Sequence, residues 1–443
     1  MDYPEKTMFY CFLNACLTPL RVFKLGPFKH GMVTIEKAMK YAMKKTKLQD
    51  FGDLTFVDSY AQMMSTANFK SLKLTNMGQL IFGIELNMSM CRRLTFIQYL
   101  KDVPAVEKVP VPSPVFVMGL PRTGTTFLHR LLSLDPAVRA PLTWELLSPV
   151  PKYNGVYNAE AMVPDRQKRN RFVRKLISDR KKMGDHALEH IHEINADLPE
   201  ECLLALSDEI PIHLSFLYSD YMEFGTFFKT IDYTRVVAAY SYYRKVLQLL
   251  SHQIGEGQAP RRWTLKCPIH IFYPKEIAAA FPDAKLIWTH RHPQSAVPSM
   301  CSLVKAVHQV YYEKDCKDDA ALGRAICDIS AEHLLKTPAN IEASKLDCAH
   351  VIYNDLIRDP VSVVRAIYSQ FGWEISPEYL QALNAYLEEN RQQREAIKTK
   401  REKGGGEALH TYTAEEFSLT DKELESGKFA EYVAKFNVPA SRG

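Results

Sequence analysis

The chain lacks the features that mark several specialised classes of protein. It contains no Cys-x-x-Cys pair and no Cys and His spacing typical of a zinc site, and its 9 cysteines are scattered. An odd number of scattered cysteines gives no disulfide framework and indicates reduced thiols in a cytoplasmic protein. The surplus of Lys and Arg over Asp and Glu is only +5, which is too small to indicate a nucleic-acid partner.

The chain also lacks a long hydrophobic run. The apolar run near the N-terminus, residues 8–17, is interrupted by Asn14 and has about half of the roughly 20 residues that a membrane-spanning helix needs. A signal peptide begins with positive charge, whereas Asp2 and Glu5 precede this run. We therefore expect a cytoplasmic protein without stable membrane insertion. Residues 8–24 are expected to pack on the domain or, at most, to touch a membrane surface.

The chain has an ordinary globular composition. It has 443 residues, of which 46% are hydrophobic and 24% charged, enough to bury a large core without disulfides. Residues 30–102 carry apolar positions at helical spacing, and the proline-rich segment 109–114 breaks any helix. We expect a helical N-terminal segment (1–108) and an α/β core (109–390). A basic, glycine-rich loop and a C-terminal helix that packs on the core should follow (391–443).

Four short apolar runs in the core are typical of buried parallel strands. They are residues 115–118, 263–265, 285–288 and 350–353. Helical patterns separate them, and strands that alternate with helices form a parallel sheet with helices on its faces. The sequence therefore predicts a three-layer α/β fold of the P-loop-like type.

The segment after the first run, residues 119–126, is the most informative part of the chain. It joins a strand to a helix, where backbone N–H groups and the helix dipole bind phosphate. Gly119 and Gly124 have the spacing of a Walker A loop, but Thr125 stands where that loop requires Lys. A P-loop-type small-molecule or nucleoside kinase is therefore a weaker alternative, as is a non-catalytic nucleotide-binding protein.

A second pair of residues suits a phosphate group. Arg291 follows the third strand run, and Ser299 lies eight residues later, on the next expected helix. An arginine fork and a hydroxyl together fit a phosphate monoester.

Both motifs resemble those of sulfotransferases that use 3′-phosphoadenosine 5′-phosphosulfate (PAPS). Residues 120–126 resemble the 5′-phosphosulfate loop of the sulfotransferase family 3 group and of tyrosylprotein sulfotransferases. Arg291 and Ser299 match the 3′-phosphate motif, and Pro199-Glu200-Glu201 resembles a family turn. The resemblance runs from about residue 30 to 436. It implies transfer of a sulfuryl group from PAPS to a hydroxyl or amine of a small acceptor by in-line displacement, with no metal required.

The resemblance also implies roles for single residues. Arg122 is expected to neutralise the transferring group, and Lys266 is expected to reach the bridging oxygen of the donor. The general base is left open between Glu145, whose structural alternative is helix capping, and His270. The residues expected to bind the nucleotide are Arg122, Thr123, Gly124, Thr125, Thr126, Arg291, Ser299, Tyr353, Lys400 and Arg401. The identity of the small hydroxylated acceptor and a homo-oligomeric state are left open.

Overall fold

A parallel sheet lies at the centre of the computed structural model. Among the described residues it has five strands, in the order β2-β3-β1-β4-β5, and all the strand pairs are parallel. The strands are β1 (Val115–Met118), β2 (Val138–Arg139), β3 (Arg262–Lys266), β4 (Lys285–His290) and β5 (Asp347–Ile352). This confirms the predicted α/β fold with a parallel sheet, and β1 is buried along its whole length, as its unbroken apolar run predicts.

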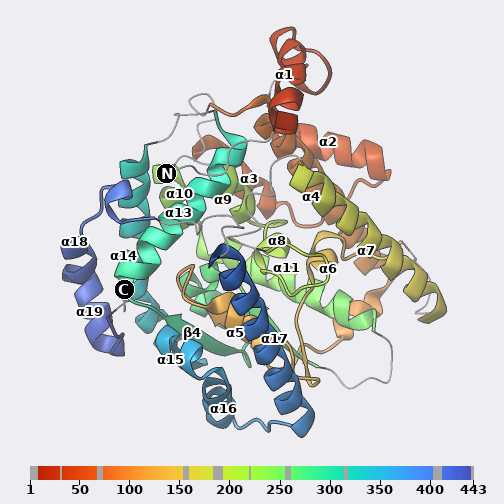
Figure 1. Cartoon of the computed structure of the whole chain (residues 1–443). Helices are drawn as coiled ribbons and strands as arrows, with labels where there is room; N and C mark the ends of the chain where they lie inside the picture. Colours follow the sequence, from red (N-terminus) through yellow and green to blue (C-terminus); the bar gives the residue numbers. More distant parts are fainter. Residues whose placement is uncertain are drawn as a thin grey trace.

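Helices surround the sheet (Figure 1). The structure describes residues 8–29, 32–66, 73–152, 159–182, 193–218, 221–254, 261–313, 318–402 and 412–440. The helices are α1 (Met8–Val22), α2 (Ile35–Thr46), α3 (Thr55–Thr66), α4 (Asn76–Asp102), α5 (Thr125–Leu132), α6 (Thr143–Leu147), α7 (Ala159–Lys182), α8 (Leu203–Leu206), α9 (Ile212–Tyr218), α10 (Tyr221–Thr230), α11 (Tyr233–His252), α12 (Pro274–Ala280), α13 (Pro293–Tyr311), α14 (Asp319–Ser344), α15 (Tyr353–Arg358), α16 (Pro360–Phe371), α17 (Pro377–Glu402), α18 (Asp421–Glu425) and α19 (Gly427–Phe436).

The strand register brings the expected site residues to one edge of the sheet. Val117 on β1 is paired with Lys266, the last residue of β3, and with Ile287 on β4. The segments that follow β1, β3, β4 and β5 therefore all leave the sheet at its carboxyl edge. Ligands of open parallel sheets bind at this edge.

Two apolar clusters cover the two faces of the sheet. The cluster with α5, α16 and α17 buries β1 side chains such as Val115 and Val117. The larger cluster buries Phe116 and Met118 together with side chains of α2 and α4. The N-terminal helices thus share one core with the sheet, and the expected boundary at residue 390 falls within α17.

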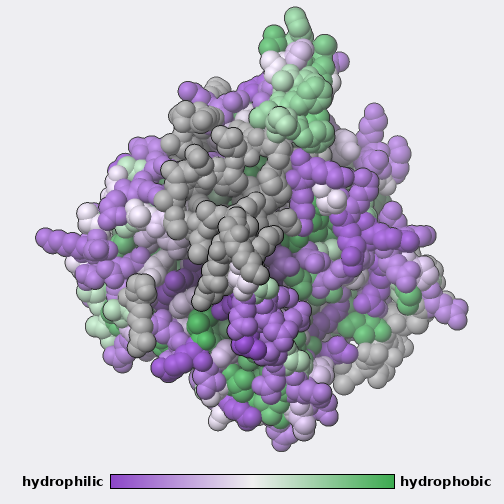
Figure 2. Space-filling view, viewed as in Figure 1, coloured by the Kyte–Doolittle hydropathy of each residue, from purple (hydrophilic) through white to green (hydrophobic). Residues whose placement is uncertain are grey.

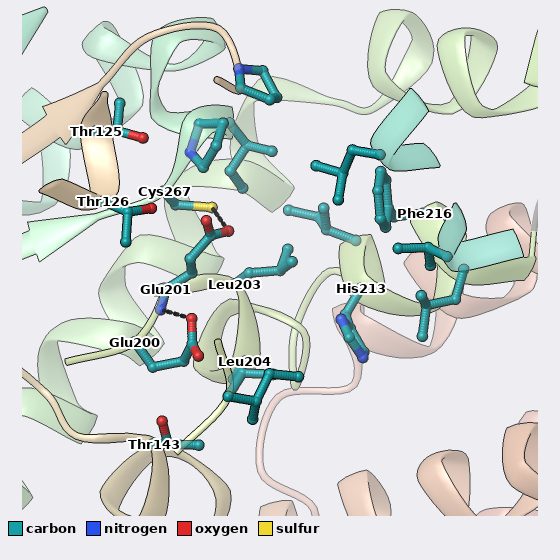
Figure 3. Close-up of a pocket in the computed structure, with 18 of the residues that line it drawn as sticks. Thr125, Thr126, Thr143, Glu200, Glu201, Leu203, Leu204, His213, Phe216 and Cys267 are labelled. Atoms are coloured by element: carbon teal, nitrogen blue, oxygen red, sulfur yellow. Dashed lines mark hydrogen bonds between the residues drawn. The ribbon is translucent and has the colours of Figure 1, made fainter. Parts of the chain in front are cut away.

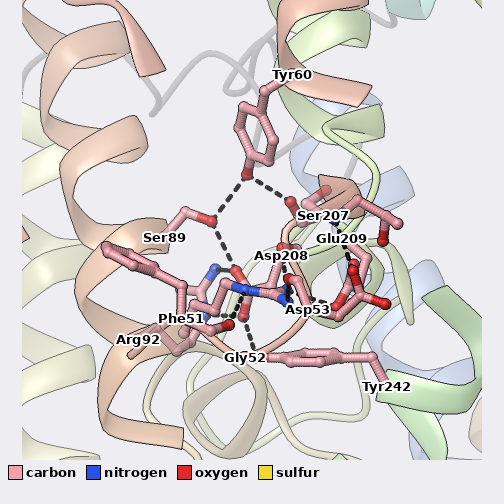
Figure 4. A network of polar contacts seen from close by, with 12 residues as sticks. Phe51, Gly52, Asp53, Tyr60, Ser89, Arg92, Ser207, Asp208, Glu209 and Tyr242 are labelled. Carbon is pink, nitrogen blue, oxygen red and sulfur yellow. Dashed lines mark hydrogen bonds and ion pairs between the residues drawn. The ribbon is translucent and has the colours of Figure 1, made fainter. Parts of the chain in front are cut away.

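A buried network of charged side chains joins α4 to the segment after α8 (Figure 4). Arg92 is ion-paired with Asp208, and Arg93 Nη1 lies 2.5 Å from Glu209 Oε1. Arg93, with 1% of its side chain exposed, also donates to the carbonyl oxygens of Phe51, Asp53 and Asp208. Burial raises the pKa of Glu209 to about 7, although the Arg93 guanidinium opposes that rise. These contacts fix the N-terminal helices to the segment that follows α8.

We expect Arg93→Ala to destabilise the folded protein by about 3–5 kcal/mol, because it leaves a buried carboxylate and three carbonyl oxygens without their donor. The midpoint of urea unfolding measures this loss. Arg391→Ala is the matched control, since Arg391 pairs with Glu388 and Glu395 on an exposed helix face, and its midpoint should hardly move. Equal midpoints for the two variants would contradict a stabilising role for the network.

Candidate active site

The loop of residues 119–126 turns sharply between β1 and α5. Gly124 caps α5 with a φ of +88°, a left-handed conformation that favours glycine. A Cβ atom at this position would lie 3.0 Å from the Tyr353 ring. Arg122 also has a positive φ of +69°, and such strain at a non-glycine residue is often found at functional sites. The turn places the first N–H groups of α5 and the Thr125 and Thr126 hydroxyls beside a cavity (Figure 3).

Four of the expected nucleotide-binding residues meet at this loop. Arg122 Nε donates a hydrogen bond to Ser299 Oγ at 3.2 Å, and Arg291 Nη1 donates to the Arg122 carbonyl oxygen at 2.8 Å. The Arg291 guanidinium lies over the Tyr353 ring, 4.2 Å from its centroid. The structure therefore collects two guanidinium groups, a hydroxyl and an aromatic ring from separate elements.

Thr123 is placed differently from the other two threonines of the loop, Thr125 and Thr126. Its side chain is buried, its hydroxyl donates to the Leu120 carbonyl oxygen at 2.7 Å, and it lies 2.6 Å from Thr289 Oγ1. These bonds tie the loop to β4. Thr123 thus holds the shape of the loop, and Thr125 and Thr126 are the two threonines of the loop that line the cavity.

The cavity has a volume of about 870 Å³ and two chemically different ends. One end is lined by the loop and by Arg122 and Arg291. The other end is lined largely by apolar side chains of α4, α9 and α13, such as Ile81, Phe216 and Val307, and the same helices add Glu85, Arg92 and His213 to the lining. In Figure 3 the Thr125 and Thr126 hydroxyls lie on one side of Glu201, and Phe216 lies on the other. The cavity can therefore accept an anionic group and an apolar body together.

A partly buried ion pair, Lys266 with Glu201, lies at the wall of the cavity. Lys266 has 1% of its side chain exposed, and its Nζ lies 2.6 Å from Glu201 Oε1. Glu201 lines the cavity, and its backbone N–H donates to Glu200 Oε1 at 2.8 Å. Burial lowers the pKa of Lys266, but the Glu201 and Glu200 carboxylates outweigh burial, so that this pKa is raised above its usual value. Lys266 is therefore a protonated, buried cation whose partner faces the cavity.

Glu145, the first expected base, lies away from the cavity. It is buried, with 3% of the residue exposed. One carboxylate oxygen accepts from Arg139 Nη2 at 2.6 Å, and the other accepts from the Leu142 N–H at 3.0 Å. This capping arrangement at the start of α6 is the structural role that the sequence left as its alternative. Because Glu145 is not among the residues that line the cavity, we do not retain it as the proposed base.

His270, the second expected base, faces the core. Its Nδ1 lies 2.7 Å from the Tyr240 hydroxyl, and its ring packs edge-on against Phe116 at 5.0 Å. Burial lowers its pKa to about 3. The short 3-10 helix Pro268–Phe272 turns His270 inward, while Ile269 and Ile271 line the cavity. His270 therefore packs the wall of the site from behind.

The remaining expectations concern α17 and a metal. The side chains of Lys400 and Arg401 lie outside the described residues, although Arg394, earlier on α17, lines the cavity. Within the described part of the chain, no group of three or more His, Cys, Asp or Glu residues is arranged to hold a metal ion.

No described helix has both the length and the apolar character that crossing a bilayer requires.

The sequence interpretation gave no role to Glu201. Its signal was the Pro199-Glu200-Glu201 turn, which was recognised as a motif only. The partner of Glu201 lies 65 residues away in the chain, so that local spacing gave no indication of the ion pair with Lys266.

The comparisons with known proteins agree with one another. A family model described as "Sulfotransferase family" matches residues 114–378. Omega-hydroxy-beta-dihydromenaquinone-9 sulfotransferase Stf3 of Mycobacterium bovis and of Mycobacterium tuberculosis is 26% identical over 294 residues, which cover 63% of this chain and 68% of the relative. Sulfotransferase STF9 from Mycobacterium avium superposes with a TM-score of 0.76 at 26% identity, over 93% of this chain and 98% of that chain. Sulfotransferase STF1 from Mycobacterium tuberculosis gives 0.70 at 25% identity, over 91% and 98%.

The buried position of His270 predicts how stability depends on pH. Its pKa is about 3 in the folded protein against an ordinary value of 6.5, and His129 is shifted in the same way by burial. The unfolded chain therefore binds more protons between these values, so that stability is full above pH 6.5 and is lost as pH falls toward 3.

We expect His270→Gln to make this loss shallower, by up to about 1.4 kcal/mol per pH unit. Urea unfolding midpoints of the parent and the variant between pH 7.5 and 5 measure the slope. Above pH 7.5 the two proteins should have parallel profiles, which serves as the control. Identical slopes below pH 6.5 would mean that solvent protons reach His270 in the folded protein, as a base facing the cavity would require.

Proposed function

The chain belongs to the sulfotransferase family, and we propose that it transfers a sulfuryl group from PAPS to a hydroxyl of a small, largely apolar acceptor. The observation that carries the proposal is the position of the Lys266–Glu201 ion pair. Glu201 lines the cavity that the loop and the apolar side chains share, and Lys266 is its buried partner. The family match and the related sulfotransferases favour this chemistry over a kinase, as does Thr125 in the place of the Walker lysine.

The residues at the loop fit the donor nucleotide. The N-terminus of α5 and the Thr125 and Thr126 hydroxyls offer donors for the oxygens of the 5′-phosphosulfate. Arg291 and the Ser299 hydroxyl are suited to the 3′-phosphate, because a guanidinium and a hydroxyl together bind a phosphate monoester. The Tyr353 ring, already beside Arg291, offers an apolar surface to the nucleoside.

The ion pair supplies the charges that the reaction needs. In sulfuryl transfer the bond from sulfur to the phosphate oxygen breaks, and a bond from sulfur to the acceptor oxygen forms. We assign to Lys266 the stabilisation of the negative charge that develops on the leaving phosphate oxygen. Glu201 is placed to accept the proton of the acceptor hydroxyl, because its carboxylate faces the cavity. We assign the role of general base to Glu201 in place of Glu145 and His270.

The apolar end of the cavity supports a lipophilic acceptor. Its lining comes from α4, α9 and α13, with side chains such as Ile84, Leu217 and Met300. Burial of apolar surface favours binding by roughly 25 cal/mol per Å², so that an extended hydrocarbon would bind there more strongly than a polar acceptor. The mycobacterial relative is named for a hydroxylated menaquinone, which agrees with such an acceptor.

We expect Arg291→Ala to weaken binding of 3′-phosphoadenosine 5′-phosphate (PAP) by about 1.5–3 kcal/mol, the range for a charge-assisted hydrogen bond. Isothermal titration calorimetry without metal measures the affinity, with ADP and Mg-ATP as comparison ligands. Arg358→Ala is the control, since Arg358 is exposed on α15 and pairs with Asp355. A parent protein that prefers Mg-ATP, or a variant that binds PAP as tightly as the parent, would contradict the assignment.

We expect Glu201→Gln to lower kcat by about 10²–10⁴-fold, the usual contribution of a general base, with PAP affinity nearly unchanged. Sulfuryl transfer from radiolabelled PAPS to an aliphatic alcohol such as 1-decanol measures the rate. Glu193→Gln is the control, because Glu193 lines the cavity but pairs with Arg130, and its rate should stay close to that of the parent. A Glu201→Gln variant with normal kcat would show that another group accepts the proton.

A further inference from the structure

Large apolar side chains gather on the surface at α1 and the turn that follows it. Figure 2 shows this hydrophobic surface at the top of the molecule, where α1 projects from the body (Figure 1). The exposed side chains, which we call the α1 face, are Met8, Phe9, Phe12, Val22, Phe23 and Leu25. Phe12 is 65% exposed and Phe23 is 70% exposed. Contiguous exposed apolar surface of this kind marks an interaction site.

The opposite side of α1 is firmly attached to the body. The Tyr10 hydroxyl is buried and donates to the Val310 carbonyl oxygen at 2.6 Å. Asn14 Oδ1 accepts from the Met77 N–H at 3.0 Å, and Arg21 Nη1 donates to the Leu74 carbonyl oxygen at 3.1 Å. The exposed side chains are therefore presented by a helix with fixed orientation.

The charged side chains of residues 8–29 have one sign. Between Met8 and Lys29 the sequence has no Asp or Glu, while Arg21, Lys24 and Lys29 are all exposed. Apolar side chains flanked by exposed cations are typical of segments that lie in the interface of an anionic membrane. Two copies of the same face would bring like charges together, so that this pattern favours lipid over a second copy of the chain.

We propose that the α1 face docks the protein on an anionic lipid surface, with Phe12 and Phe23 among the side chains that enter the interface and Lys24 and Lys29 at the headgroups. α1 is too short to span a bilayer, at 15 residues, so it lies on the membrane and does not cross it. This inference concerns an interaction surface outside the candidate active site and does not depend on the proposed chemistry.

The position of α1 also relates the membrane to the cavity, a step that does rest on the proposed function. Val310, which binds Tyr10, is followed by Tyr311, which lines the cavity. On α4, Met77 binds α1, while Ile84 lines the cavity and is 45% exposed. The apolar end of the cavity is thus lined by the same two helices that hold α1. Docking would bring this end close to lipophilic acceptors dissolved in the bilayer.

The test is vesicle flotation with the full chain, in the absence of nucleotide and acceptor. Vesicles of phosphatidylcholine alone are compared with vesicles containing about 30% phosphatidylglycerol, at low and high salt. We expect the parent protein to bind the anionic vesicles, and to bind them less at high salt because the charges are then screened. No binding to either kind of vesicle would overturn the proposal, whatever the outcome of the sulfuryl-transfer assays.

The double variant F12S/F23S should bind anionic vesicles at least about tenfold more weakly, since two buried aromatic contacts are lost. The matched control is L54S/Y233S, because Leu54 and Tyr233 are exposed to 56% and 49% elsewhere on the surface. Its binding should stay within about twofold of the parent. Equal binding by F12S/F23S and the parent would overturn the proposal. The proposal would also be overturned if light scattering showed that the parent is a dimer and that F12S/F23S is a monomer. That result would assign the α1 face to self-association.

Discussion

The buried charge of Lys266 is the constraint around which the site is built. An ammonium group with 1% of its side chain exposed requires a close counter-ion, and Glu201 supplies it from a different part of the chain. The backbone keeps the two together, because the Cys202 N–H donates to the Lys266 carbonyl oxygen at 3.0 Å. The turn that carries Glu201 is therefore fixed to the end of β3, at the carboxyl edge of the sheet where the loop 119–126 also begins.

The same turn links the sheet to the N-terminal helices. Within a few residues of Glu201 the chain reaches Asp208, which is ion-paired with Arg92 on α4 and accepts from the Ser89 hydroxyl at 2.7 Å. The Tyr60 hydroxyl on α3 donates to the Ser207 carbonyl oxygen at 2.6 Å. The N-terminal helices therefore do more than cover an independent core: they hold in place the segment that carries the carboxylate and forms part of the cavity wall.

The limits of sequence prediction follow from the range of each interaction. Buried strands and the loop 119–126 depend on local apolar runs and local glycine spacing, so that the sequence could predict them. Arg291 follows β4 and Ser299 lies on α13, the next helix, so that their separation is set by local structure. The sequence could not show how Glu145 and His270 are oriented, because their orientation depends on contacts with Arg139 and Tyr240. Such contacts form only in the folded protein, and no periodicity in the sequence reports them.

Under the proposed function, the ion pair would bring charge stabilisation and proton transfer together at one place. The Lys266 ammonium cannot fully neutralise both Glu201 and a leaving phosphate oxygen. As negative charge develops on that oxygen, the attraction between Lys266 and Glu201 weakens. The Glu201 carboxylate is then freer to accept a hydrogen bond from the acceptor hydroxyl. The acceptor hydroxyl would then lose its proton most readily when the bond to the leaving group is breaking, which is when the reaction needs a base.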